Sequence, residues 1–338
     1  MRLPEFSYVE AGSVQEASAI LATSDSLPLS GGTDLLVNMK HRLLQPSTLV
    51  DIKKIADLAS IRELPGGEIS LGALTTLGTI ERSTLIKERI PSLAVAAQSV
   101  GTPQIRNKAT LGGNICLNTR CWYYNVPPFS RKTRQVCIKQ GGSVCHVVPG
   151  EKQGRCYSLF SADTVPVLMA LDSMVKVSSG ETSRVVPLAE LYTGDGANPI
   201  ALRRGELVTE VLVPPLPVRT SSCYLKLRER GTLDFPILGI ASALTFEEDK
   251  RTCRKARIVL TGVSSGPFEA TEAEAFLENK TMTAQVKTEA ANLVREQVRV
   301  YTLNGIPARY MRSMIAEYVL KALSQTGQDV SEERGGAL

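Results

Sequence analysis

Hydrophobic and polar positions near the start of the chain alternate between a helical and an extended pattern. Ser13 and Glu16 have the spacing of a capping box, which predicts an amphipathic helix directly behind them. Short apolar runs at 27–29 and 48–52 predict two strands, and apolar residues at helical spacing from Leu35 onward predict a helix between them. The start of the chain therefore forms a small unit in which strands and helices alternate.

The rest of the chain first repeats this pattern and then changes character. A helix is predicted from Pro91 to Val100, followed by Gly101, a residue type that commonly ends helices. An apolar helix and a strand are predicted at 165–171 and 174–177. Three strands and three amphipathic helices follow, at 222–227, 237–246 and 257–263 and then near 269–278, 284–299 and 308–323. Strands followed by helices are typical of an α+β domain.

These patterns divide the chain into three predicted domains, at 1–55, 56–218 and 219–328, with a disordered tail at 329–338. The 338 residues are 43% hydrophobic and 22% charged, as in soluble globular proteins. No apolar run approaches the ~20 residues that a membrane span needs, so we expect a cytoplasmic protein without a membrane partner. A net charge of +5 is too small to indicate a nucleic-acid partner.

Two glycine turns are candidates for binding an anion. The sequence Ser-Gly-Gly-Thr-Asp at 30–34 joins an expected strand to an expected helix, and Thr-Leu-Gly-Gly-Asn at 110–114 lies about 80 positions later. A strand, a glycine turn and a helix N-terminus together present backbone N–H groups to a group such as a pyrophosphate. One such turn is weak evidence, but two turns predict that one dinucleotide is held from opposite sides.

Four cysteines, Cys121, Cys137, Cys145 and Cys156, fall within 36 residues of a chain that has seven in all. An odd number in a cytoplasmic protein argues against a disulfide framework and leaves metal binding or burial. Thiolates suit iron–sulfur clusters or zinc. The spacings of 16, 8 and 11 include no pair separated by the two to four residues typical of structural zinc, which favours a cluster while leaving zinc open. The other three cysteines are expected to be buried core residues.

Charge is concentrated around these cysteines. Between 117 and 160, seven basic residues stand against the single acid Glu151, so this stretch carries +6 and the remainder 5 − 6 = −1. The stretch is either a solvated loop or a basic surface that offsets an anionic cluster or attracts an acidic partner.

Several motifs together resemble the FAD-binding subunit of the xanthine dehydrogenase family of molybdenum hydroxylases. They are Ser-Gly-Gly-Thr-Asp-Leu-Leu at 30–36, Gln-Ile-Arg-Asn at 104–107 with Ala-Thr-Leu-Gly-Gly-Asn at 109–114, Asp163 before an apolar run, and Tyr-Leu-Lys at 224–226 with Asp234 downstream. The resemblance covers nearly the whole chain. It implies an α+β fold, with a two-part FAD-binding domain of the vanillyl-alcohol-oxidase type followed by a C-terminal α+β domain.

The chain departs from the usual family pattern at one place. Family members reach the aspartate within about ten residues of the Gly-Gly-Asn turn, whereas 48 residues separate Asn114 from Asp163 here. About 40 residues, at roughly 117–158, are therefore inserted, and we call them the inserted segment. The segment resembles a loop in the β subunit of 4-hydroxybenzoyl-CoA reductase that holds an additional [4Fe–4S] cluster. The resemblance assigns all four spaced cysteines as cluster ligands.

The same resemblance assigns non-covalent FAD to two facing loops. The implied FAD-binding residues are Leu29, Ser30, Gly31, Gly32, Thr33, Asp34, Leu35, Gly101, Thr110, Asn114, Asp163 and Lys226. The first seven would wrap the pyrophosphate and ribityl, Asp163 would bind a sugar hydroxyl, and Lys226 would lie near the flavin ring. His146, next to Cys145, is expected on a surface loop. No catalytic acid, base or nucleophile is predicted in this chain.

The implied function is electron transfer within a larger enzyme. A large partner subunit would carry the molybdenum cofactor and a small one two [2Fe–2S] clusters, in a dimer of heterotrimers. In the 4-hydroxybenzoyl-CoA reductase interpretation, reduced ferredoxin donates electrons through the [4Fe–4S] cluster and FAD to molybdenum, where a phenolic hydroxyl is removed. The alternative is an oxidative hydroxylase of the same family, in which electrons leave through FAD. A binding protein with structural zinc is a third possibility.

Overall fold

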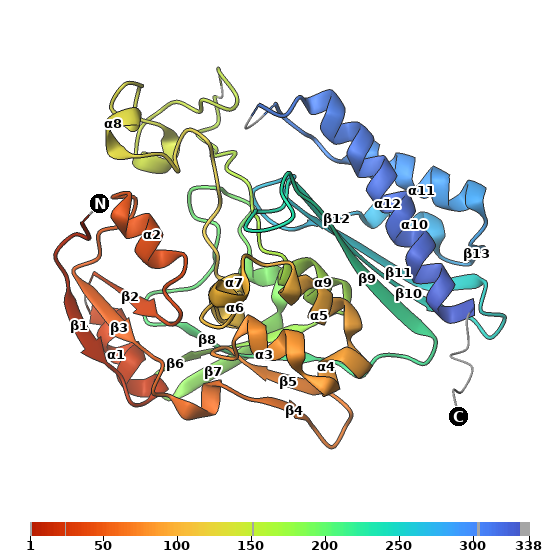
Figure 1. Cartoon of the computed structure of the whole chain (residues 1–338), viewed down its shortest axis with the longest axis horizontal. Coiled ribbons are helices and arrows are strands. Elements are labelled where there is room, and N and C mark those ends of the chain that lie inside the picture. The colour runs from red at the N-terminus through yellow and green to blue at the C-terminus, as the bar shows by residue number, and fades with distance from the viewer. Residues whose placement is uncertain (1, 24, 151, 303–304, 332–338) are drawn as a thin grey trace.

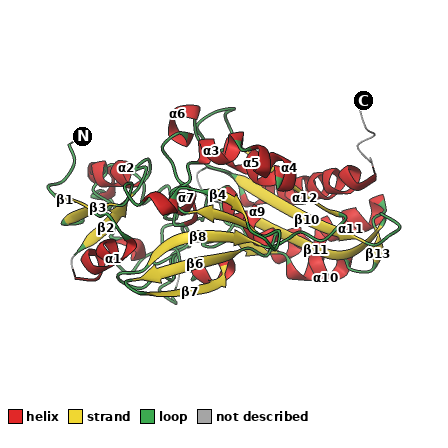
Figure 2. Ribbon diagram, turned by 90° about the horizontal axis from the view of Figure 1, so that it is seen from below, coloured by secondary structure: helices red, strands yellow, loops and turns green. Residues whose placement is uncertain are grey.

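The computed structural model describes residues 2–23, 25–150, 152–302 and 305–331, with side chains placed up to residue 326. Three β-sheets lie in a row along the molecule, as Figure 2 shows. Both helices and strands are used throughout, which confirms the predicted α+β class. Within the described residues, no helix is long and apolar enough to cross a membrane.

The first sheet is parallel and has the strand order β1-β3-β2. Its elements are β1 (Ser7–Glu10), α1 (Val14–Thr23), β2 (Ser26–Leu29), α2 (Leu35–Lys40) and β3 (Thr48–Asp51). Ser13 caps α1 as predicted, because its Oγ accepts from the Glu16 amide at 3.1 Å while the Glu16 carboxylate accepts from the Gly12 amide at 2.8 Å. The turn at 30–34 connects β2 directly to α2.

The second sheet is antiparallel and has the order β4-β5-β8-β6-β7. Its strands are β4 (Ile61–Glu63), β5 (Ile69–Gly72), β6 (Met174–Ser179), β7 (Thr182–Pro187) and β8 (Leu207–Val213). The helices between β5 and β6 are α3 (Leu77–Arg82), α4 (Thr84–Arg89), α5 (Pro91–Gln98), α6 (Pro103–Arg106), α7 (Leu111–Ile115) and α9 (Thr164–Ala170), apart from the inserted segment. Short 3-10 turns lie before β4 at Ala56–Leu58 and after β7 at Leu188–Leu191. Helix α7 begins at the second glycine turn.

The third sheet has the order β12-β11-β10-β9, and β13 also pairs with β11. Its strands are β9 (Thr220–Leu227), β10 (Leu238–Phe246), β11 (Thr252–Thr261), β12 (Phe268–Glu269) and β13 (Lys280–Thr281). Helices α10 (Thr271–Leu277), α11 (Ala284–Gln297) and α12 (Ala308–Ser331) follow along the chain. The prediction of a disordered tail from 329 is wrong for residues 329–331, which belong to α12, and residues 332–338 of that tail lie outside the described residues.

Strand β10 is buried on both faces and joins two hydrophobic cores. Ala241 and Ala243 belong to the core that contains α5 and α9, whereas Ile240 and Leu244 belong to the core under α10, α11 and α12. Because side chains alternate along a strand, one strand serves both cores. The C-terminal sheet is therefore packed against the second unit and cannot be removed without exposing that unit's core.

The inserted segment stands out at the top of Figure 1, above α2. Its described residues form α8 (Pro128–Arg131) and a 3-10 turn at Ile138–Gln140 as helical elements. Its two stems meet where Arg120 and Leu159 exchange backbone hydrogen bonds of 2.7 Å. Arg131 donates to the carbonyls of His41 at 2.9 Å and Arg42 at 3.2 Å, just beyond the end of α2. A cation at the C-terminal end of a helix binds carbonyls that the helix leaves without a partner.

Candidate functional site

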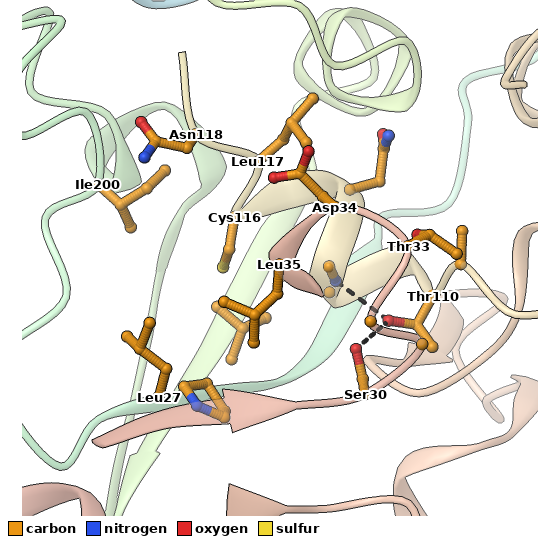
Figure 3. Close-up of a pocket in the computed structure, with 18 of the residues that line it drawn as sticks. Leu27, Ser30, Thr33, Asp34, Leu35, Thr110, Cys116, Leu117, Asn118 and Ile200 are labelled. Carbon is orange, nitrogen blue, oxygen red and sulfur yellow. Dashed lines mark hydrogen bonds between the residues drawn. The ribbon is translucent and has the colours of Figure 1, made fainter. Parts of the chain in front are cut away.

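The two glycine turns line a single cavity of about 890 Å³, which we call the glycine-loop pocket (Figure 3). The pocket lies between the first sheet and the second unit, and it also contacts the loop at 233–235 that follows β9. Its volume falls within the range of small-molecule and cofactor sites.

Hydroxyl groups join the two turns across the chain. Ser30 Oγ and Thr110 Oγ1 lie 3.0 Å apart, and Thr110 Oγ1 also accepts from the Gly113 amide at 3.2 Å (Figure 3). Thr110 is the N-cap of α7, so the residue that begins this helix also fixes the facing loop. The prediction that the turns come together from positions 80 apart agrees with this geometry.

Glycine is required in the pocket wall for steric reasons. A Cβ at Gly31 would lie 1.9 Å from the backbone oxygen of Lys108, and one at Gly113 would lie 3.1 Å from Thr110 Oγ1. Gly32 has a φ of +68°, which a β-branched residue rarely adopts. The two backbones therefore approach more closely than side chains allow, and the resulting cradle fits an extended ligand such as FAD.

All the residues assigned to FAD line this pocket except Lys226. Lys226 Nζ donates to Ser99 O at 3.0 Å and lies 3.0 Å from Asp163 Oδ1, which also accepts from the Tyr224 hydroxyl at 2.7 Å. Burial raises the pKa of Asp163 and lowers the pKa of Lys226, so their attraction only partly offsets desolvation. Asp163 forms no side-chain cap on α9, because its carboxylate is engaged with the C-terminal sheet.

Asn114 lines the pocket but also holds α9 in place. Its Oδ1 accepts from the Thr164 hydroxyl at 2.7 Å and from the Thr164 amide at 3.3 Å. Cys116 also lines the pocket; it is partly buried and packs against the core of the second unit, and desolvation raises the pKa of its thiol to about 12.

Sequence reasoning missed several pocket residues. They include Arg120 at the start of the inserted segment, Arg203 and Arg204 before β8, and Leu233 and Phe235 after β9. Only the basic character of the inserted segment pointed toward any of them, because the others come from loops without a motif. Arg120 forms an ion pair with Asp34 and lies 4.6 Å from the centre of the Phe235 ring.

A second, smaller cavity is lined by all four spaced cysteines, and we call it the cysteine cavity. Cys137, Cys145 and Cys156 are buried, and Cys121 is partly exposed. Burial, together with smaller contributions from the charges of Cys156 and Cys137, raises the pKa of Cys121 to about 11. The structure thus brings together four residues that span 36 positions of the sequence.

A partly buried lysine also lines the cysteine cavity. Lys139 Nζ donates to Asn118 Oδ1 at 2.8 Å and to the Gly196 carbonyl at 2.8 Å, and it lies 5.1 Å from the centre of the Tyr124 ring. Burial lowers its pKa to about 8, and the nearby cysteine thiolates oppose this shift. The basic character of the segment is therefore partly internal, because Lys139 and Arg120 are both largely withdrawn from solvent.

Among the described residues, no group of three or more His, Cys, Asp or Glu side chains is arranged to hold one metal ion. His146 also lines the cavity, and its Nε2 lies 2.9 Å from the Gln135 carbonyl.

Comparison with known proteins extends over nearly the whole chain. Residues 4–216 match the family described as FAD binding domain in molybdopterin dehydrogenase, and residues 223–326 match the CO dehydrogenase flavoprotein C-terminal domain. A 6-hydroxypseudooxynicotine dehydrogenase complex subunit alpha from Paenarthrobacter nicotinovorans is 30% identical and covers 96% of each chain. The carbon monoxide dehydrogenase medium chain of Hydrogenophaga pseudoflava is 28% identical over 95% of this chain and 96% of its own. A solved carbon monoxide dehydrogenase from Hydrogenophaga pseudoflava superposes with a TM-score of 0.79 at 26% identity, covering 98% of this chain and 99% of that one.

Proposed function

This chain belongs to the FAD-binding medium subunits of the xanthine dehydrogenase and CO dehydrogenase family, and from that premise we propose that its inserted segment adds an iron–sulfur cluster to the flavin. The protein is an oxidoreductase subunit, and its partners carry the molybdenum cofactor and the [2Fe–2S] clusters. FAD supplies a centre that exchanges electrons, and the chain's own residues bind it, orient it and exclude water.

The observation that carries the proposal is the meeting of four cysteines around one cavity beside the glycine-loop pocket. A [4Fe–4S] cluster takes four thiolates, one at each iron corner, so its ligands surround a volume. Structural zinc typically uses paired ligands two to four residues apart, and the spacings of 16, 8 and 11 include no such pair. Lys139 places a cation beside the thiolates, which favours an anionic occupant.

Two directions of electron flow are consistent with these features. The relatives named above are dehydrogenases, and this favours the oxidative alternative, in which electrons leave the molybdenum centre through FAD. The additional cluster favours entry of electrons from a low-potential donor, as in a 4-hydroxybenzoyl-CoA reductase. All-cysteine [4Fe–4S] centres reach strongly reducing potentials, so such a cluster suits a ferredoxin as donor.

The outer surface of the inserted segment supports an acidic donor. Trp122, Phe129 and Val136 are 59%, 73% and 57% exposed, and Lys132 and Arg134 lie among them in the sequence. Apolar anchors with nearby cations suit a protein partner of opposite charge. Arg131 is not free for this role, since it binds the end of α2.

Metal analysis of the purified chain tests the cluster. We expect about four irons and four acid-labile sulfides per chain, and their loss when any of the four cysteines is changed to alanine. Cys223→Ala is the matched control, because Cys223 lies in β9 against Ser242 and should leave iron unchanged. Zinc without sulfide, or full iron content in all four variants, would contradict the proposal.

Reduction of the flavin by an external donor tests the direction of electron flow. In the assembled enzyme, we expect reduced ferredoxin to reduce the flavin, and Lys132→Gln with Arg134→Gln to slow this step severalfold and flatten its salt dependence. The matched control neutralises Lys87 and Arg312, which are exposed on α4 and α12. Rapid substrate-driven reduction of an external acceptor, with no ferredoxin-linked reduction, would decide for the oxidative alternative.

A further inference from the structure

Arg120 stands between the two cavities. Its side chain lines the glycine-loop pocket, and the next residue, Cys121, lines the cysteine cavity. Adjacent residues of the backbone therefore line the two cavities at this point, and a displacement of the Arg120 backbone also displaces Cys121.

On the pocket side, Arg120 binds the turn that forms the pocket wall. Its guanidinium pairs with Asp34, the N-cap residue of α2, and donates to Asn38 Oδ1 at 3.3 Å one helical turn later. The guanidinium also lies over the Phe235 ring. A ligand that orders the turn at 30–34 thus orders Asp34, the ion-pair partner of Arg120 (Figure 3 shows Asp34 beside the pocket).

On the cysteine side, Arg120 holds the stems of the inserted segment together. Its backbone exchanges two hydrogen bonds of 2.7 Å with Leu159, three residues after Cys156. Cys121 and Cys156 therefore lie on the two stems just inside the loop that this bridge closes, and the bridge restricts the distance between these stems.

The charge of Arg120 makes its position sensitive to its surroundings. Its side chain is only 17% exposed, and its Nε is buried without a hydrogen-bond acceptor among the described residues. Breaking a buried ion pair by removal of one partner is costly because the other charge stays desolvated. Arg120 is thus held in one arrangement as long as Asp34 is ordered.

We propose that Arg120 is a positioning residue that couples FAD binding in the glycine-loop pocket to cluster retention in the cysteine cavity. The inference rests on the proposed function, since it assumes a cluster in that cavity. Coupling between two sites is reciprocal for equilibrium binding, so FAD tightens the binding of the cluster by the same factor by which the cluster tightens the binding of FAD. Typical couplings are about 5- to 150-fold, and we expect a value near tenfold here.

The test compares FAD affinity of the full chain with and without iron. The dissociation constant is measured by flavin fluorescence in iron-loaded protein and in protein stripped by a chelator. We expect the ratio of the two constants to be about ten in the original chain and near one in Arg120→Gln. Arg120→Lys keeps the cation without the planar guanidinium and should recover part of the ratio, which also covers the case in which Arg120→Gln does not fold.

Arg131→Gln is the matched control. Arg131 also ties the inserted segment to α2, but it does not line the glycine-loop pocket. We expect this variant to lose iron faster while keeping the ratio near ten. An unchanged ratio in both Arg120 variants, or an equal loss in Arg131→Gln, would overturn the role of Arg120. A ratio of one in an iron-binding original chain refutes the coupling alone, whereas a chain without iron refutes the cluster itself.

Discussion

The glycine-loop pocket and the cysteine cavity are built in different ways. The pocket is lined by residues of regular elements, including β2, α2, α7 and β8, and its two turns are joined by hydroxyl and amide hydrogen bonds. The cysteine cavity is lined by the inserted segment, in which the described residues form one helical turn and one 3-10 turn. Side chains that donate to backbone carbonyls, such as Arg131 and Tyr124, hold that segment against the end of α2.

This difference indicates which cavity needs its bound cofactor to keep its shape. The pocket's shape follows from sheet pairing and core packing, so it is expected to persist without FAD. The cysteine cavity places several thiols in a poorly solvated space with little regular structure, and metal binding contributes folding energy in such sites. We therefore expect the pocket to tolerate loss of the segment, and the segment to depend on its metal.

Deletion of the inserted segment should separate the two cavities most sharply. Residues 121–157 are removed and a short glycine linker joins Arg120 to Ser158, which the backbone bridge between Arg120 and Leu159 brings close. We expect complete loss of about four irons per chain while FAD still binds, with the affinity of the iron-free chain. Iron content and flavin absorbance are the measurements. Loss of both cofactors together would show that the pocket is not independent.

A side chain at Gly31 should damage the pocket alone. In Gly31→Val the new Cβ meets the Lys108 carbonyl, so one turn must move away from the other. Overpacking of this kind costs about 1–3 kcal/mol, which is roughly 5- to 150-fold if it appears in FAD affinity. Gly66→Ala is the control, because a Cβ there meets nothing within 4 Å. The dissociation constant of FAD is measured by fluorescence, and equal affinity in the two variants would remove Gly31 from the pocket wall.

At the interface between the second unit and the C-terminal sheet, we expect a smaller effect on FAD binding but a clear effect on the free energy of unfolding. Asp163→Asn leaves Lys226 buried without its carboxylate, and breaking a buried pair costs about 3–5 kcal/mol. The control is Glu63→Gln, whose carboxylate is 41% exposed and pairs with the 52% exposed Arg89, and exposed pairs contribute about 0–1 kcal/mol. Denaturant unfolding compares the two. Equal free energies of unfolding would mean that Lys226 finds another partner.

Local sequence patterns predicted the elements that local physics controls. The capping box before α1, the glycine turn before α2 and the apolar spacing in α9, α11 and α12 all correspond to observed elements. The second sheet was largely missed, apart from β6. Strand β8 pairs with β5 from positions about 140 residues apart, as in the contact between Ser70 and Glu210, and no local period records such a pairing.

The sequence by itself determined the chemistry that this protein carries: two glycine turns, four spaced cysteines and a basic inserted segment. Residue type sets backbone freedom, thiolate affinity and charge, whatever the surroundings. Only the tertiary structure decided how those groups are used. In the folded chain Lys226 pairs with Asp163, and Lys139 lies beside the cysteines. Arg131 donates to carbonyls at the end of α2, and Arg120 lies between the two cavities. Burial and partner choice depend on segments far apart in the chain, and for that reason they become visible only once the chain is folded.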